Sequence, residues 1–199
     1  LLVGDDIFYQ IYDDPPYVHH LMEICLELGK RAHVWMKAIS GEPMTQCHHG
    51  DIYSESFGIR ICEDTTAIVS EEIVREFAMP YTSRLAAAFG GAWVHYCGRS
   101  DHLTKILCEI PEVVGINFGL MPGGKQAHDF DKDMALFLEH RKVYVGNLPK
   151  NEKESGKEYL RRLHSFASQG ILIPNIQEAL SGHEPFNDIR EMAAFWYGL

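Results

Sequence analysis

The sequence lacks the features of a membrane protein or a nucleic-acid-binding protein. No stretch approaches the ~18 consecutive apolar residues that a membrane span needs. The opening residues also lack a basic region followed by an apolar one, so a signal peptide is not indicated. No run of Lys and Arg could follow a phosphate backbone, and 28 acidic residues outnumber 18 basic ones. We therefore expect a cytoplasmic protein without a membrane or nucleic-acid partner.

Paired cysteines are missing as well. The five cysteines are an odd number and form no C-x-x-C motif, which argues against a disulfide framework. A functional cysteine in this chain is then a metal ligand or a reactive thiolate. The chain also begins at Leu1, on an apolar pair and without methionine, so we expect that N-terminal sequence is missing.

Helical and strand patterns alternate along what we interpret as one domain, residues 1–199, without a low-complexity linker. Apolar residues repeat at helical spacing from Asp14 toward Ile39, and again from Ser70 to Leu85, with a kink expected near Pro80. Further helices are expected near residues 104–108, 134–138, 159–166 and 185–196. Strands are expected at residues 58–64, 92–97, 113–118, 143–148 and 171–173.

This order is a helix followed by five strand–helix units, which predicts parallel strands joined by right-handed crossovers. An open doubly wound sheet and a (β/α)8 TIM barrel both have such units. No G-x-G-x-x-G follows a strand, which removes the best sign of a dinucleotide-binding sheet. Because a full barrel needs eight units in about 250 residues, we expect an α/β fold that is the C-terminal portion of a TIM barrel.

His95 and Cys97, in WVHYCGRSDH, carry the most chemical information. Side chains on a strand alternate between faces, so both project from the same face, at the carboxyl end of the strand. Active sites of parallel α/β folds form at that edge. Imidazole nitrogen and thiolate sulfur are preferred zinc ligands, and a catalytic zinc takes three protein ligands and keeps one position open. The alternative is a His and a Cys that only line the core.

Two further clusters offer ligands or acid/base groups. His49 and Asp51, in the segment CHHGD, offer an acid/base pair, or else belong to a solvated loop. Cys62 and Asp64 share one face of the strand at residues 58–64 and reach the same edge as His95. Carboxylates at that edge serve as supporting partners or substrate ligands.

Polar residues also follow the strands at two later places. Asn117 ends VVGIN, and Asn147 stands in the equivalent position of VGN. Each is a candidate for the same edge, or a helix cap and nothing more. Arg99 and Asp101 follow Cys97 in the turn GRSDH and add charge beside it.

The successive units resemble one known family. FYQIYDDPPYVHHLME, SEEIVREFAMPYTSRL, WVHYCGR, VVGINFG and VYVGNLP are similar, in order and spacing, to the C-terminal barrel units of the uroporphyrinogen decarboxylase superfamily. The most specific part is S-E-E-x-x-x-E-F-x-x-P-Y at residues 70–81 followed by H-x-C-G. The resemblance covers nearly the whole chain and implies a TIM barrel with its pocket at the carboxyl face.

Within this superfamily, uroporphyrinogen decarboxylases need no metal, while methylcobalamin:coenzyme M methyltransferases hold zinc on an H-x-C…C motif. His95 and Cys97 match the first two ligands of that motif. The resemblance therefore implies an enzyme in which zinc deprotonates an acceptor thiol that takes a methyl group from a corrinoid. The family's last Cys is absent from GILIPNIQ near the end of the chain. Cys62, Asp64 or His49 would then supply the third ligand, or no zinc binds.

The leading interpretation is a zinc-dependent methyltransferase with metal ligands His95, Cys97 and Cys62. In this interpretation acid/base groups come from Asp64, His49 and Asp51, and an acidic substrate is oriented by Arg99, Asp101 and Asn117. One alternative is a metal-free decarboxylase of a tetrapyrrole or other polycarboxylate; another is a non-catalytic corrinoid- or ligand-binding protein. A corrinoid protein is an expected partner. Five units also leave two sheet edges unpaired, which favours a homo-oligomer.

Overall fold

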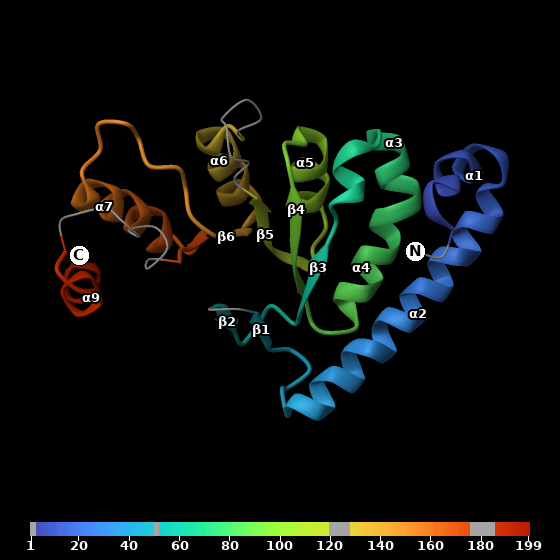
Figure 1. The fold of residues 1–199 in the computed structure, drawn as a ribbon, viewed down its shortest axis with the longest axis horizontal. Coiled ribbons are helices and arrows are strands. Elements are labelled where there is room, and N and C mark those ends of the chain that lie inside the picture. The colour runs from blue at the N-terminus through green and yellow to red at the C-terminus, as the bar shows by residue number, and fades with distance from the viewer. Residues whose placement is uncertain (1–2, 50–51, 120–127, 176–185) are drawn as a thin grey trace.

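The amino-terminal part of the chain is helical and leads into a parallel sheet (Figure 1). A computed structural model describes residues 3–49, 52–119, 128–175 and 186–199. A short 3-10 turn, η1 (Gly4–Asp6), precedes α1 (Ile7–Asp13) and the long helix α2 (Pro15–Ser40). The Asp14 carboxylate caps α2 by accepting from the Tyr17 amide at 3.1 Å, and Gly41 ends the helix in the left-handed conformation. The long helix is confirmed, while α1 was not among the expected elements.

The five expected strands form one parallel sheet. Its neighbours follow chain order, β3-β4-β5-β6-β7, without a reversal. The strands are β3 (Ile59–Cys62), β4 (Ala92–Cys97), β5 (Val113–Gly119), β6 (Val143–Val145) and β7 (Leu172–Ile173). The expected strand at residues 143–148 is shorter than predicted, because Gly146, at φ 145°, leaves the strand conformation.

The helix expected from Ser70 to Leu85 is present, and a π-helical turn lies just before Pro80, where a kink was expected. A 3-10 turn, η2 (Thr65–Ile68), comes first; then α3 (Glu71–Ile73), the π-helical turn η3 (Val74–Ala78) and α4 (Met79–Ala87) follow without a break. The cause lies at Pro80, which has no N–H to donate and whose ring crowds the carbonyl one turn earlier. The chain widens into a π turn before the proline and resumes an α-helix after it.

The remaining helices alternate with the strands. They are α5 (Asp101–Glu109), α6 (Phe130–His140), α7 (Gly156–Ala167) and α9 (Ile189–Tyr197). Asp129 caps α6 by accepting from the Lys132 amide at 3.2 Å. Asp188 caps α9, so this helix begins later than the expected residue 185. Among the described residues, no helix combines the length and the apolarity that crossing a membrane requires.

The helices that follow the strands pack against one face of the sheet. Val94 and Tyr96 of β4 belong to the same buried cluster as Leu107 of α5, Phe137 of α6 and Leu163 of α7. Because side chains alternate along a strand, the intervening residues of β4 point to the opposite face. A second, smaller buried apolar cluster lies on that face and is formed by Cys47, Phe57, Trp93 and Val145. The residues that follow Trp93 in the same alternation are His95 and Cys97.

A hairpin after α2 was not predicted. It joins β1 (Cys47–His49) and β2 (Ile52–Ser54) in antiparallel pairing. The Trp93 indole donates to the Cys47 sulfur at 3.4 Å, and the Gly58 amide donates to the Thr45 carbonyl at 2.9 Å. These contacts hold the hairpin at the amino-terminal end of the strands, below the sheet in Figure 1.

Candidate metal centre

Three potential metal ligands converge at the carboxyl ends of β3 and β4. One ligand atom each from Cys62, Asp64 and His95 lies within 4.8 Å of the other two. The sheet register brings this about, because Cys62 pairs with His95, and the Glu63 amide donates to the His95 carbonyl at 2.7 Å. Two strands that are distant in sequence therefore present their polar ends at one point.

Asp64 ties the two strand ends together. Its Oδ1 accepts from the Cys97 amide at 2.7 Å, and its Oδ2 accepts from the Cys62 thiol at 3.3 Å. The same Oδ1 lies 3.9 Å from Nε2 of His95. The carboxylate thus touches all three other polar groups of the cluster.

Cys97 adds a fourth ligand atom beside this group. Its Sγ lies 3.4 Å from Nε2 of His95, as the alternation along β4 predicts. Both sulfurs are exposed, while the His95 ring is mostly buried. The cluster therefore opens to solvent on the side of the cysteines and rests on the sheet on the side of the imidazole.

The orientation of His95 is fixed from behind. Its Nδ1 contacts Oδ1 of Asn117, the residue that pairs with His95 on β5. The Asn117 amide nitrogen donates to the Val145 carbonyl, so its oxygen is the atom that faces His95. An amide oxygen only accepts, hence Nδ1 carries a hydrogen and the lone pair of the neutral ring lies on Nε2. This is the arrangement in which metal-binding histidines are usually held.

Local electrostatics keep both thiols protonated in the absence of a metal. Burial raises the pKa of Cys62, and the adjacent Asp64 raises it further. Burial and Asp64 act in the same way on the pKa of Cys97, while the guanidinium of Arg60 lowers both values by less. For Asp64, partial burial raises the pKa, but hydrogen bonds from Cys62 and Cys97 outweigh it, so the carboxyl stays ionised. A bound cation would displace the thiol protons.

This donor set fits zinc. Thiolate, imidazole and carboxylate are the three ligand types that zinc binds in proteins, and three such groups leave one position of a tetrahedral zinc open. A third ligand beside His95 and Cys97 is available from Cys62 at the end of β3, or from Asp64 just after it. Both were among the candidates from the sequence.

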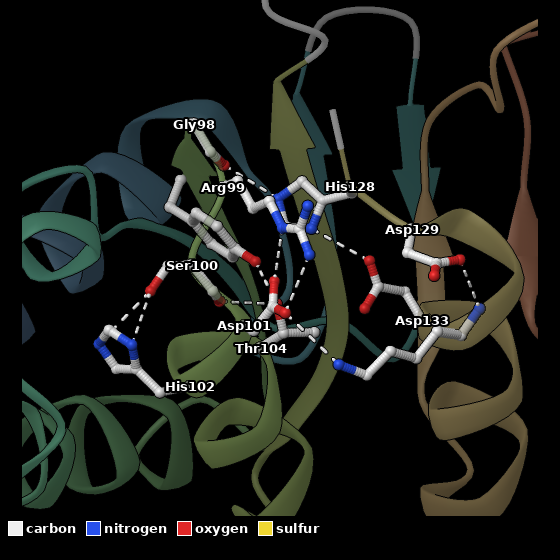
Figure 2. Close-up of polar contacts among 11 residues, drawn as sticks. Gly98, Arg99, Ser100, Asp101, His102, Thr104, His128, Asp129 and Asp133 are labelled. Carbon is white, nitrogen blue, oxygen red and sulfur yellow. Dashed lines mark hydrogen bonds and ion pairs between the residues drawn. The ribbon is translucent and has the colours of Figure 1, made fainter. Parts of the chain in front are cut away.

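The residues expected to orient an acidic substrate occupy different surroundings. Arg99 forms a two-pronged ion pair with Asp101, at 2.8 and 3.1 Å, and Lys132 approaches Asp101 at 3.4 Å (Figure 2). The hydrogen bonds from Arg99 lower the pKa of Asp101 to about 2. Arg99 and Asp101 therefore neutralise each other at the start of α5, and Asn117 holds His95.

The remaining candidates from the sequence lie elsewhere. His49 is part of β1, in the hairpin at the amino-terminal end of the sheet, and Asp51 lies outside the described residues. Asn147 follows β6, and its Oδ1 is buried without a hydrogen-bond partner among the described residues.

A second polar pair was missed by the sequence analysis. The buried His128 contacts Asp133 Oδ2 through Nδ1 at 3.0 Å and the Gly98 carbonyl through Nε2 at 2.9 Å (Figure 2). Its ring stacks on Phe118 with centroids 3.6 Å apart. Both ring nitrogens therefore face acceptor oxygens. The pair anchors the residue directly after Cys97. No periodicity marks this contact, because His128 precedes a helix as an isolated loop residue.

Comparisons of this chain with protein families, with curated proteins and with solved structures find no match.

Proposed function

We propose that this chain belongs to a zinc-dependent enzyme of the uroporphyrinogen decarboxylase superfamily, which transfers a methyl group between a corrinoid and a thiol. The observation that carries the proposal is the convergence of Cys62, Asp64 and His95 at the carboxyl edge of a parallel sheet, with Cys97 beside them. Active sites of parallel α/β folds form at this edge.

The topology supports a portion of a TIM barrel over a doubly wound sheet. A doubly wound sheet reverses its strand order part-way, which places helices on both faces. Here β3 to β7 follow chain order, and α5, α6 and α7 join one buried cluster on one face. The opposite face, with Trp93 and His95, would be the interior of the closed barrel.

The protein residues have separable roles in this proposal. Zinc, when bound, would supply Lewis-acid stabilisation of a substrate thiolate. Cys62, His95 and Cys97 would be its ligands, and Asn117 keeps Nε2 of His95 directed at them. Asp64 is the ionised carboxylate within reach of the cluster, so it could complete the ligand set or accept the proton of an incoming thiol.

Metal analysis of the purified protein tests the proposal. We expect about one equivalent of zinc, lost in Cys62→Ser and in His95→Gln but kept in Cys25→Ser, which alters a cysteine of α2 outside the cluster. Cobalt substitution should give thiolate-to-cobalt absorption that disappears in Cys97→Ser. Zinc below about a tenth of an equivalent, with no change in Cys97→Ser, would refute the metal site.

Activity assays separate the remaining alternatives. Methyl transfer from methylcobalamin to a thiol, abolished by chelation and restored by zinc, is the expected result. Porphyrinogen turnover by zinc-free protein would instead indicate the metal-free decarboxylase. Zinc or corrinoid binding without turnover would indicate a ligand-binding protein.

A further inference from the structure

A cavity of about 340 Å³ has none of Cys62, Asp64, His95 and Cys97 among its lining residues. Its walls come from the carboxyl-terminal half of α2, from β1 and from the start of β3. This volume is at the lower end of the range for small-molecule sites. Met36 and Ile59 contribute apolar wall, and the charged side chains of the lining are Lys37, Glu42 and Arg60.

Two of these charges cancel each other. Lys37 is buried and donates to Glu42 Oε2 at 2.8 Å, and also to the backbone carbonyls of Gln46 and Pro43. An ammonium group has three hydrogens to donate, so these three acceptors use all of them. Lys37 therefore has no hydrogen left to donate to a ligand, and its charge is balanced by that of Glu42.

Arg60 is the cation that remains. Its Nε is buried and has no hydrogen-bond partner, and no ion pair to Arg60 exists among the described residues. The guanidinium lies over the Trp93 ring, 5.3 Å from the centroid. Stacking occupies one face of the guanidinium, so a planar anion in the cavity would meet its terminal N–H groups rather than the buried Nε. An unpaired arginine is notable in a chain of net charge −10.

The other polar groups of the lining are neutral or exposed. Burial and the nearby Lys37 lower the pKa of His33, so its ring is neutral and offers one N–H and one lone pair. His48 is exposed at the rim. The net charge presented by the cavity at neutral pH is therefore the single positive charge of Arg60.

We propose that this cavity binds a small monocarboxylate with an apolar tail, the carboxylate on the guanidinium of Arg60 and the tail against the exposed side chain of Met36. One free positive charge balances one negative charge, whereas a phosphate dianion would leave excess charge in a partly enclosed site. No residue of the lining is a proposed zinc ligand, so the inference does not depend on the proposed zinc chemistry.

Calorimetric titration of the zinc-free protein with hexanoate, hexanamide and inorganic phosphate tests the proposal. We expect saturable hexanoate binding, with hexanamide and phosphate weaker. Arg60→Gln should weaken hexanoate binding by about tenfold or more, the factor for a lost charge-assisted hydrogen bond. Arg60→Lys keeps the charge but cannot donate two parallel hydrogen bonds. Its affinity for hexanoate should lie between those of Arg60→Gln and the unaltered protein. Arg75→Gln, which removes an arginine already paired with Glu71 and Glu109, should bind hexanoate as the unaltered protein does.

Circular dichroism shows which variants fold, and if Arg60→Gln does not, the Arg60→Lys comparison decides. The proposal is overturned by hexanoate affinity that is equal in the unaltered protein and the folded Arg60 variants, by phosphate binding as tight as hexanoate, or by no saturable binding at millimolar hexanoate. If the unaltered protein binds hexanoate but no zinc, the proposed function is refuted and the proposal for this cavity stands.

Discussion

Asn117 determines which nitrogen of His95 faces the two cysteines. The two residues are paired neighbours on β4 and β5, and the Asn117 amide is itself held by the Val145 carbonyl. The ring is therefore presented with its lone pair on Nε2, 3.4 Å from the Cys97 sulfur. The site thus depends on a residue that need not touch any ligand.

Replacing Asn117 should weaken metal binding without removing a ligand. Asn117→Leu leaves His95 free to rotate and change tautomer, so we expect zinc affinity to fall by roughly 10- to 100-fold. Asn117→Asp keeps an acceptor for Nδ1 and should retain more of the affinity. Competition with a chromophoric chelator measures the change, and Asn151→Leu, in an exposed loop, is the control. Unaltered affinity in Asn117→Leu would contradict this account of His95.

Glu63 should make the protein less stable as the pH rises. Burial raises its pKa, opposed by hydrogen bonds from Thr82 and Thr66. The Thr82 hydroxyl donates to Oε1, and the Thr66 hydroxyl lies 3.1 Å from Oε2 while it also contacts the Glu63 carbonyl at 2.6 Å. At pH values well below 4.5, the pKa of an unfolded Glu, the carboxyl is protonated in both the folded and the unfolded chain, so its raised pKa does not change the stability. Stability then falls as pH rises from there through the folded pKa.

Glu63→Gln removes that ionisation and keeps an amide oxygen to accept from the Thr82 hydroxyl. We expect the Tm of this variant minus that of the unaltered protein, both measured without zinc, to increase steadily between about pH 4 and pH 8. Glu152→Gln, at an exposed position, should show no such trend. A Tm difference that does not vary with pH would mean that the Glu63 carboxyl ionises as it does in the unfolded chain.

The sequence predicts the repeating elements well because they bury one face each. The strands of the sheet and the helices beside it show apolar periodicity, which can be recognised in the sequence without knowing which element each one packs against. The hairpin of β1 and β2 could not be predicted, because its strands are three residues long and show no periodicity. Its position depends on contacts of Cys47 with Trp93 and of Thr45 with Gly58, which no local pattern encodes.

The same division applies to the candidate site. Cys62, Asp64, His95 and Cys97 can be found from the sequence, because alternation and strand ends place them at one edge. The partner of Arg99 and the contact of Asn117 with His95 depend on rotamers and on register. Arg60 has no sequence signal, because an arginine in a strand usually points to solvent or forms an ion pair.

Arg141 carries backbone strain that a glycine would relieve. It ends α6 with φ 54° and ψ 42°, the one left-handed residue other than glycine among those described. We expect Arg141→Gly to raise the free energy of unfolding by about 1 kcal/mol, since the Cβ clash is removed. Arg141→Ala keeps the Cβ and is the matched control. Denaturant titration measures both, and an equal gain in both variants would place the effect in the side chain.

His128 and Asp133 should behave as one unit in unfolding. Both are buried, and His128→Leu would leave the Asp133 carboxylate and the Gly98 carbonyl without their donors. We expect a loss of about 3–5 kcal/mol for that variant, the usual cost of breaking a buried pair from one side. The double variant His128→Leu/Asp133→Leu should be less destabilised than the sum of the single variants, because no unpaired charge remains.

Denaturant unfolding of the four proteins in this cycle measures the coupling, with His20→Leu, at an exposed position of α2, as the control for removing an imidazole. Strict additivity would show that the two side chains do not form an ion pair. Since His128 holds the carbonyl that directly follows Cys97, the same variants also report on the metal cluster. If zinc affinity falls in His128→Leu while the protein remains folded, the buried pair positions the Cys97 thiol.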